Sequence, residues 1–233
     1  MITNSFRNDA EYFSSLLDSR TPFCVTRYGD GEMYVFEGRL GKNSVNEFEF
    51  NGQEHLKQEL LESYEHIQEN YFVGIPCKCC VGEENFNKMK KLSLKDDDKL
   101  TWANIFVNSN FNFFRNSMVP LFDKYKINIV APGSIENLPF KVNNFYRVGY
   151  NAWVNNASVY DELVDYISSN NIKGELFLFC AGPFAKTLSY KLFKQFPDNT
   201  YLDLGSVFLR ELGLRANRGY LNGANTLNKV CIW

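Results

Sequence analysis

The 233-residue sequence has no run of about 20 consecutive apolar residues, the length that a membrane-spanning helix requires. Its opening residues, MITNSFRNDAEYF, lack the apolar stretch and small-residue cleavage site of a secretory signal. An excess of charge is missing too, because 25 basic and 27 acidic residues leave a formal net charge of −2. This balance gives no electrostatic reason to bind nucleic acid. We therefore expect a cytoplasmic protein without a transmembrane segment.

Histidine is also scarce, with only His55 and His66 in the chain. Both fall on one predicted helix, about three turns and roughly 16 Å apart, so they cannot bind the same metal ion. A Ser–His–Asp hydrolase needs a histidine in its active site, and this scarcity disfavours that class. We expect surface or packing roles for both histidines.

Three of the six cysteines crowd into the stretch 77-CKCC-80. Cys77 and Cys80 have the spacing of half a structural zinc site, but the sequence has no second pair at that spacing. Because no secretory signal is visible, we expect reduced thiols, and the sequence assigns no role to the cluster. The remaining cysteines are scattered at Cys24, Cys180 and Cys231.

Short apolar runs rich in β-forming residues alternate with segments whose apolar residues recur at helical spacing. Strands are predicted at 22–28, 71–76, 127–133, 175–182 and 200–205, and helices at 54–68, 158–169, 183–196 and in parts of 101–125. This alternation predicts an α/β fold with a mostly parallel sheet and helices on both faces. The length suits one domain covering residues 1–233. The charged stretch 88–99 is expected to be a solvated loop.

Glycine-containing turns follow three of the predicted strands, at Gly29, Gly133 and Gly182. Parallel sheets bind ligands in the crevice beyond the carboxyl ends of their strands. We therefore expect these three turns to meet at one edge of the sheet.

The turn 181-AGPFAK-186 has the features of an anion site. Gly182 allows close approach of a ligand, Pro183 suits a first helical turn, and Lys186 lies one turn into the helix. Backbone N–H groups at a helix start bind phosphate, and Lys186 would add a formal charge. An ordinary strand–helix turn with a solvated lysine is the alternative, and the spacing of a P-loop is absent.

The stretch 27-RYGDGE-32 contains two carboxylates two positions apart. In an extended segment, Asp30 and Glu32 would point to the same side and could bind one cation together. Carboxylate oxygens suit Mg²⁺ or Mn²⁺ and leave coordination positions for waters and substrate phosphates. The alternative is a β-hairpin, because Asp-Gly between apolar runs is a strong two-residue turn signal.

RYGDGE also resembles the Asp-x-Glu signature of the GT-D glycosyltransferases, usually seen as Arg-[Phe/Tyr]-Gly-Asp-Gly-Glu. Three further segments are similar to segments of that family and follow in the same order. They are NAW at 151–153 with YDELV after it, GPFAK at 182–186 and LDLG at 202–205. The four matches span most of the chain.

This resemblance implies a Rossmann-like α/β domain that transfers a sugar from a nucleotide diphosphate sugar. Asp30 and Glu32 would hold Mn²⁺ or Mg²⁺ against the diphosphate. The chain departs from the family after Asp203, where GSVFLREL replaces a histidine and further acidic residues. The residues that we expect to contact the donor are Arg27, Gly29, Gly133, Asn151, Trp153, Gly182, Pro183 and Lys186.

The expected reaction moves a hexose, such as glucose from UDP-glucose, to a glycan or glycoprotein acceptor. The metal would neutralise charge on the leaving diphosphate. If the transfer inverts configuration, the acceptor hydroxyl needs a base, for which Asp203 is the candidate, with Glu211 and Asp161 as alternatives. Inversion and retention both remain open. So do a metal-dependent phosphohydrolase and a non-catalytic nucleotide-sugar-binding protein.

Overall fold

The computed structural model describes residues 6–42 and 48–222, and its centre is a seven-stranded sheet in the order β5-β4-β1-β9-β8-β6-β7. Every neighbouring pair of strands in this sheet is parallel. The strands are β1 (Cys24–Arg27), β4 (Tyr71–Ile75), β5 (Leu100–Trp102), β6 (Ile127–Ala131), β7 (Asn144–Arg147), β8 (Leu176–Phe179) and β9 (Thr200–Asp203). Two short strands, β2 (Gly41–Lys42) and β3 (Glu49–Phe50), form a separate antiparallel pair. The predicted α/β fold with a parallel sheet is confirmed.

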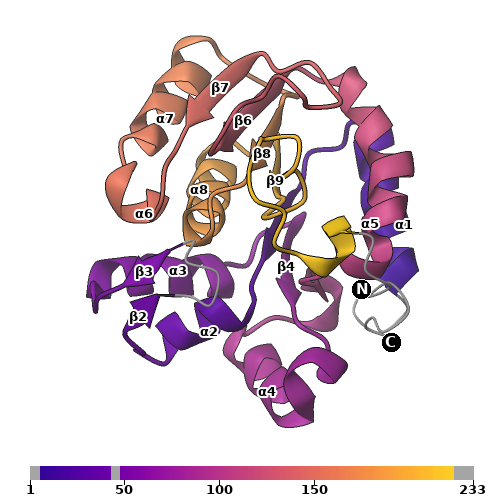
Figure 1. The fold of residues 1–233 in the computed structure, drawn as a ribbon. Coiled ribbons are helices and arrows are strands. Elements are labelled where there is room, and N and C mark those ends of the chain that lie inside the picture. Colours follow the sequence, from indigo (N-terminus) through magenta and orange to yellow (C-terminus); the bar gives the residue numbers. More distant parts are fainter. Residues whose placement is uncertain (1–5, 43–47, 223–233) are drawn as a thin grey trace.

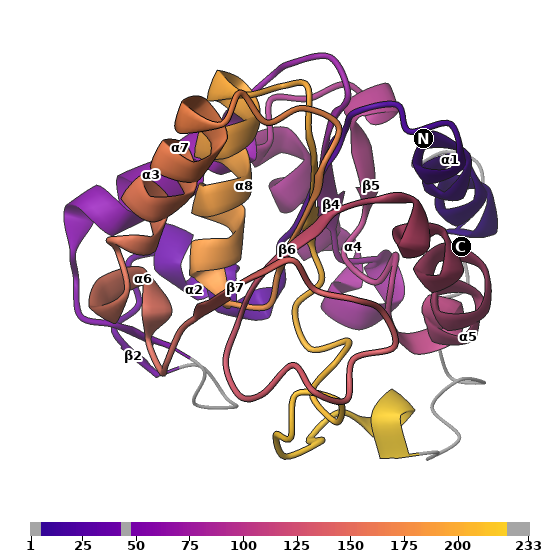
Figure 2. The same ribbon diagram turned by 90° about the horizontal axis from the view of Figure 1, so that it is seen from above.

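Helices cover both faces of the sheet, as expected (Figures 1 and 2). α3, α7 and α8 lie on one face, whereas α1 and α5 lie on the other. The α-helices are α1 (Phe6–Asp18), α2 (Asp30–Phe36), α3 (Glu54–Glu65), α4 (Lys78–Leu92), α5 (Phe111–Phe113), α6 (Ala152–Asn155), α7 (Val159–Ser169) and α8 (Pro183–Gln195). Short 3-10 or π segments span Asp97–Lys99, Asn108–Asn110, Phe114–Met118, Val119–Lys124 and Gly219–Asn222. No helix in the described ranges is long and apolar enough to cross a membrane.

The apolar runs become strands that are buried on both faces. In β8, Phe177 and Phe179 pack into the core under α3, α7 and α8, while Leu176 and Leu178 pack into the core under α1. Side chains alternate between the two faces of a strand, so a strand covered on both sides needs a continuous apolar run. This requirement explains why these strands could be found from sequence.

The first and last strands of the sheet, β1 and β9, lie side by side at its centre. The chain moves from β1 outward through β4 to β5, then crosses to the other half and returns through β8 to β9. A parallel sheet with such a change of direction forms a ligand crevice at the carboxyl ends of the strands where the direction changes. Arg27 and Asp203 are the last residues of these two strands.

One expectation about local structure was wrong. The stretch 88–99 is not a solvated loop, because α4 continues to Leu92 and buries Met89. Lys95 is buried as well and donates a hydrogen bond from Nζ to the Tyr64 carbonyl. The segment 101–125 is helical in parts, as expected; it begins within β5, and its short helical segments run from Asn108 to Lys124. Charged residues on the exposed side of α4 dominate the composition of this stretch, so its apolar side could not be recognised from composition.

The histidines have the expected surface and packing roles. His55 is exposed on α3. His66 follows the end of that helix, and its ring packs against Tyr71 and Tyr190 at centroid distances of 5.0 and 4.9 Å.

Asp9 provides a pH-dependent test of the packing of α1. Its side chain is buried and accepts a hydrogen bond from Thr101 Oγ1 at 2.9 Å. Burial raises the pKa of Asp9 from 3.8 to about 6, so the folded state holds this proton more tightly than the unfolded state. The free energy of unfolding therefore falls as pH rises from about 4 to 6, and the loss is complete above pH 6.

We expect Asp9→Asn to raise the melting temperature by about 4 °C at pH 8 and much less at pH 4. The amide keeps the acceptor for Thr101 and removes the buried charge. Differential scanning calorimetry at the two pH values measures the difference. Asp18→Asn, at the exposed end of the same helix, is the matched control. An equal rise in melting temperature at both pH values would contradict the raised pKa assigned to Asp9.

Candidate functional site

A cavity of about 560 Å³ lies at the carboxyl ends of the central strands. Its walls come from the segments that follow β1, β5, β6, β7, β8 and β9. This volume falls within the range of small-molecule and cofactor sites. The expected site residues that line it are Arg27, Gly29, Asp30, Glu32, Gly182 and Lys186.

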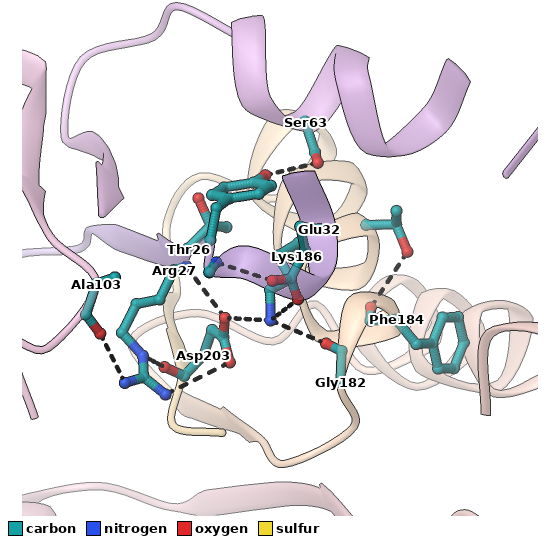
Figure 3. Close-up of polar contacts among 12 residues, drawn as sticks. Thr26, Arg27, Glu32, Ser63, Ala103, Gly182, Phe184, Lys186 and Asp203 are labelled. Carbon is teal, nitrogen blue, oxygen red and sulfur yellow. Dashed lines mark hydrogen bonds and ion pairs between the residues drawn. The ribbon is translucent and has the colours of Figure 1, made fainter. Parts of the chain in front are cut away.

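Lys186 is the centre of a buried charged cluster at this cavity (Figure 3). Its Nζ lies 3.0 Å from Glu32 Oε1 and 3.1 Å from Asp203 Oδ2, and it donates to the Gly182 carbonyl at 3.1 Å. Burial alone would lower the pKa of Lys186, but the charges of Asp203 and Glu32 outweigh it and raise the pKa. The ammonium group therefore keeps its proton inside the protein.

Arg27 is the second cation of the cluster and crosses the end of the sheet from β1. Its backbone N–H donates to Asp203 Oδ2 at 3.0 Å, and its Nε donates to the Asp203 carbonyl at 2.6 Å. Its Nη1 donates to the carbonyl of Ala103, just after β5, at 3.0 Å. These bonds lock the guanidinium in one orientation at the cavity wall.

Gly205 makes room for that guanidinium. Its φ is +56°, and a Cβ at this position would lie 2.4 Å from Arg27 Nη2. Any other residue would therefore be strained and would displace Arg27. The glycine of the LDLG segment thus has a steric function at the site.

The Asp-x-Glu segment is helical, not extended. Asp30 is the first residue of α2, and the chain runs from strand through Tyr28 and Gly29 into the helix. Residues two apart in a helix are rotated by about 200°, so the expectation that Asp30 and Glu32 point to the same side was wrong. The hairpin alternative was also wrong, because no strand follows the turn.

The two carboxylates of this segment have different environments. Glu32 is buried, and its Oε2 accepts the Gly29 N–H at 2.8 Å while Oε1 pairs with Lys186. Burial would raise the pKa of Glu32, but Lys186 and the Gly29 N–H outweigh it, so the pKa is lowered. Asp30 is exposed at the cavity wall. No hydrogen bond or ion pair within the described part of the chain holds its carboxylate.

These environments determine which carboxylate could bind a divalent cation. Asp30, Glu32 and Asp203 do not converge as a set to within 4.8 Å of one another. Both oxygens of Glu32 are occupied, so Glu32 does not fit as a ligand while Lys186 holds it. Mg²⁺ commonly binds through one or two carboxylates together with waters and substrate phosphates. The exposed carboxylate of Asp30 fits that requirement.

Asp203, the candidate base, is completely buried and does not line the cavity. Its Oδ2 is held by Arg27 and Lys186, and its Oδ1 has no hydrogen-bond partner. The carboxylate therefore positions the two cations and does not face a substrate. Glu211 pairs with Arg115, and neither it nor Asp161 lines the cavity.

Asn151 and Trp153 lie behind the cavity wall and support it. Asn151 Oδ1 accepts from Trp153 Nε1 at 2.6 Å and from the Glu49 N–H at 3.2 Å. The indole packs edge-on against Phe48, with ring centroids 5.6 Å apart, and Phe48 lines the cavity. Asn151 and Trp153, which we expected to contact the donor, thus hold β3 and the adjacent Phe48 in place.

Gly133 and Pro183 also lie outside the cavity lining. Gly133 has a φ of +83°, and a Cβ there would lie 2.1 Å from the Leu212 carbonyl oxygen. This close approach packs the turn after β6 against the segment after β9. Pro183 is buried at the first position of α8.

Several cavity residues had no signal in the sequence. Four large side chains and one amide line the walls without belonging to any motif: Tyr34, Tyr150, Tyr220, Arg218 and Asn104. They come from α2, from loops after β5 and β7, and from the C-terminal part of the described chain. Only the folded arrangement brings them together.

No family model matches the sequence, and no curated protein matches it with significance. Solved structures do resemble it. A selenomethionine-substituted structure of domain of unknown function 1792 has a TM-score of 0.58 and 20% identity over 88% of this chain and 81% of that chain. A structure of the same domain, described as having a distinct glycosyltransferase fold, gives 0.58 and 19% over the same shares. A new glycosyltransferase of this type from Streptococcus sanguinis gives 0.58 and 19%, covering 92% and 86%. The chain therefore shares the fold described for that domain.

The buried cluster makes a strong prediction about stability. Lys186→Met leaves Glu32 and Asp203 buried without their shared cation, so we expect the free energy of unfolding to fall by about 3–5 kcal/mol. Urea unfolding measures this loss. Lys191→Met on the same helix is the control, because its partially exposed pair with Glu59 should contribute less than about 1 kcal/mol.

Adding Glu32→Gln to the Lys186→Met variant should restore part of the lost stability, because one unpaired charge is removed. Equal losses for the Lys186 and Lys191 variants would show that the cluster is not electrostatically coupled.

Proposed function

We propose that this protein is a glycosyltransferase that binds a nucleotide diphosphate sugar in the cavity. The acceptor would be a glycan or glycoprotein, and the transferred sugar a hexose, with glucose from UDP-glucose as the first candidate. The observation that carries the proposal is the pair of buried cations, Lys186 and Arg27, beside a cavity at the ends of β1 and β9. The glycosyltransferase fold of the structural neighbours supports it.

The chemistry of this transfer suits a preorganised positive site. Breaking the bond between sugar and diphosphate leaves negative charge on the leaving phosphate. Lys186 and Arg27 are held by Asp203 before substrate arrives, so stabilising that charge needs no rearrangement of the cations. Gly182 is the N-cap of the 13-residue helix α8, whose first-turn N–H groups add a favourable partial charge.

The two cations are balanced by Glu32 and Asp203, so the cluster is neutral when all four groups are ionised. A diphosphate therefore needs additional positive charge at the cavity. Arg218 lines another part of the wall. When bound, Mn²⁺ or Mg²⁺ would neutralise the leaving group. Asp30 would hold this ion, and Glu32 would keep Lys186 in position.

Aromatic side chains give the cavity a surface for the nucleoside. Tyr34, Tyr150 and Tyr220 line it, and such rings pack against planar bases while their hydroxyl groups remain hydrogen-bonding partners. This arrangement supports a nucleotide donor, for which UDP is the expected nucleotide. A cytoplasmic location stays a prediction from the sequence.

Binding of UDP tests the donor site directly. We expect calorimetric titration with UDP to show binding in Mn²⁺ that weakens by at least about tenfold in EDTA. Asp30→Asn should remove the effect of Mn²⁺ without lowering the melting temperature, because the side chain is exposed. Asp161→Asn, an exposed carboxylate in the first turn of α7, should behave like the unchanged protein. Equal UDP affinity in Mn²⁺ and EDTA would contradict the metal role of Asp30.

Turnover tests the reaction. UDP-glucose and other UDP-sugars are incubated with Mn²⁺ and a panel of glycan acceptors, and released UDP is measured. We expect acceptor-dependent release that Asp30→Ala abolishes. Release of free sugar or phosphate at the same rate without acceptor would indicate a phosphohydrolase. Binding of UDP-sugars without any release would indicate a non-catalytic binding protein.

A further inference from the structure

Three thiols gather at the start of α4. The sulfur atoms of Cys77, Cys79 and Cys80 all lie within 4.8 Å of one another, and the Cys77 and Cys79 sulfurs are 2.8 Å apart. Cys77 caps the helix, and the turn that follows brings the other two side chains back toward it. Gly82, with a φ of +79°, interrupts the helix directly after this turn. The described cysteines form no disulfide.

The sequence pattern missed this arrangement because it pairs only Cys77 with Cys80. The third sulfur comes from Cys79, which is separated from Cys77 by one residue and so falls outside the usual C-x₂₋₄-C spacing. The helical turn nevertheless places it beside Cys77. The local fold therefore brings together three sulfur atoms from four consecutive residues.

Three sulfur ligands of this geometry suit a soft metal ion. Thiolates select Zn²⁺ or Cu(I) over the hard cations that carboxylates prefer. Zn–S bonds of about 2.3 Å in a tetrahedral site place the sulfurs roughly 3.8 Å apart. Cys77 is buried, but Cys79 and Cys80 are exposed, so small rotations of their side chains can reach this spacing. Their exposure also leaves a fourth coordination position on the solvent side.

We propose that Cys77, Cys79 and Cys80 bind one Zn²⁺ ion, with water as the fourth ligand. Each thiol that coordinates the ion releases its proton to solvent, so binding strengthens as pH rises. The charge and softness of this site differ from those of the carboxylate site at Asp30. The two sites are therefore expected to bind different metals.

The thiol cluster is separate from the proposed donor site but adjoins it. None of its three cysteines lines the cavity. Asn104 connects the two places, because its Nδ2 donates to Cys80 Sγ at 3.9 Å and the residue lines the cavity. Loss of zinc binding would leave the glycosyltransferase proposal intact, and failure to bind UDP would leave the zinc site intact.

Metal titration of the full-length protein tests this site. The protein is stripped with a chelator, kept reduced with a thiol-free phosphine, and titrated with Co²⁺ as a spectroscopic substitute for Zn²⁺. We expect one equivalent per chain, with sulfur-to-cobalt charge-transfer absorption that Zn²⁺ abolishes by displacement. The double variant Cys79→Ser/Cys80→Ser should weaken binding by more than about 100-fold.

Two comparisons make the result decisive. Cys180→Ser removes a buried thiol outside the cluster and should bind Co²⁺ and Zn²⁺ like the unchanged protein. The melting temperature of the double variant without metal should match that of the unchanged protein, because both side chains are exposed. Added Zn²⁺ should stabilise only the unchanged protein. Absence of the charge-transfer band, or undiminished binding in the double variant, would overturn the proposal.

Discussion

The ion pairs that Lys186 makes with Glu32 and Asp203 hold together the elements that build the cavity. Glu32 belongs to α2, Lys186 to α8 and Asp203 to the end of β9, while Arg27 ties β1 to the same carboxylate. Buried charges are tolerated only when they are paired and hydrogen-bonded. The strands β1 and β9 therefore end, and the helices α2 and α8 begin, where their charged residues reach the common cluster, and this requirement places the cavity at the centre of the sheet.

Because Glu32 pairs with Lys186, the two carboxylates of the Asp-x-Glu segment have different functions. Glu32 turns inward and supports a cation, whereas Asp30 faces the cavity and is open to a ligand. A neutral buried cluster cannot attract a diphosphate strongly by itself. In the proposed function, a cation at Asp30, together with Arg218 and the start of α8, would provide the missing positive charge.

A second group of residues supports the walls without facing the ligand. Asn151 and Trp153 hold β3 beside Phe48, and Gly205 leaves the space that the Arg27 guanidinium fills. Asn151, Trp153 and Gly205 belong to segments for which the sequence suggested a resemblance to GT-D glycosyltransferases. The resemblance thus coincides here with residues that position the site, and the thiol cluster is a proposed zinc site at the same edge of the sheet.

The sequence by itself determined the class of the fold, because strands buried on both faces must be continuous apolar runs and amphipathic helices must repeat at 3.6 residues. It also placed Arg27 and Gly182 at strand ends, where a parallel sheet binds ligands, and Lys186 one turn into the helix that follows Gly182. Only the tertiary structure decided that residues 30–36 are helical, that Asp203 is buried beneath the cavity, and that Lys186 meets Glu32. Those outcomes depend on contacts between residues far apart in the chain, and the strand order that creates such contacts is not encoded in any local pattern.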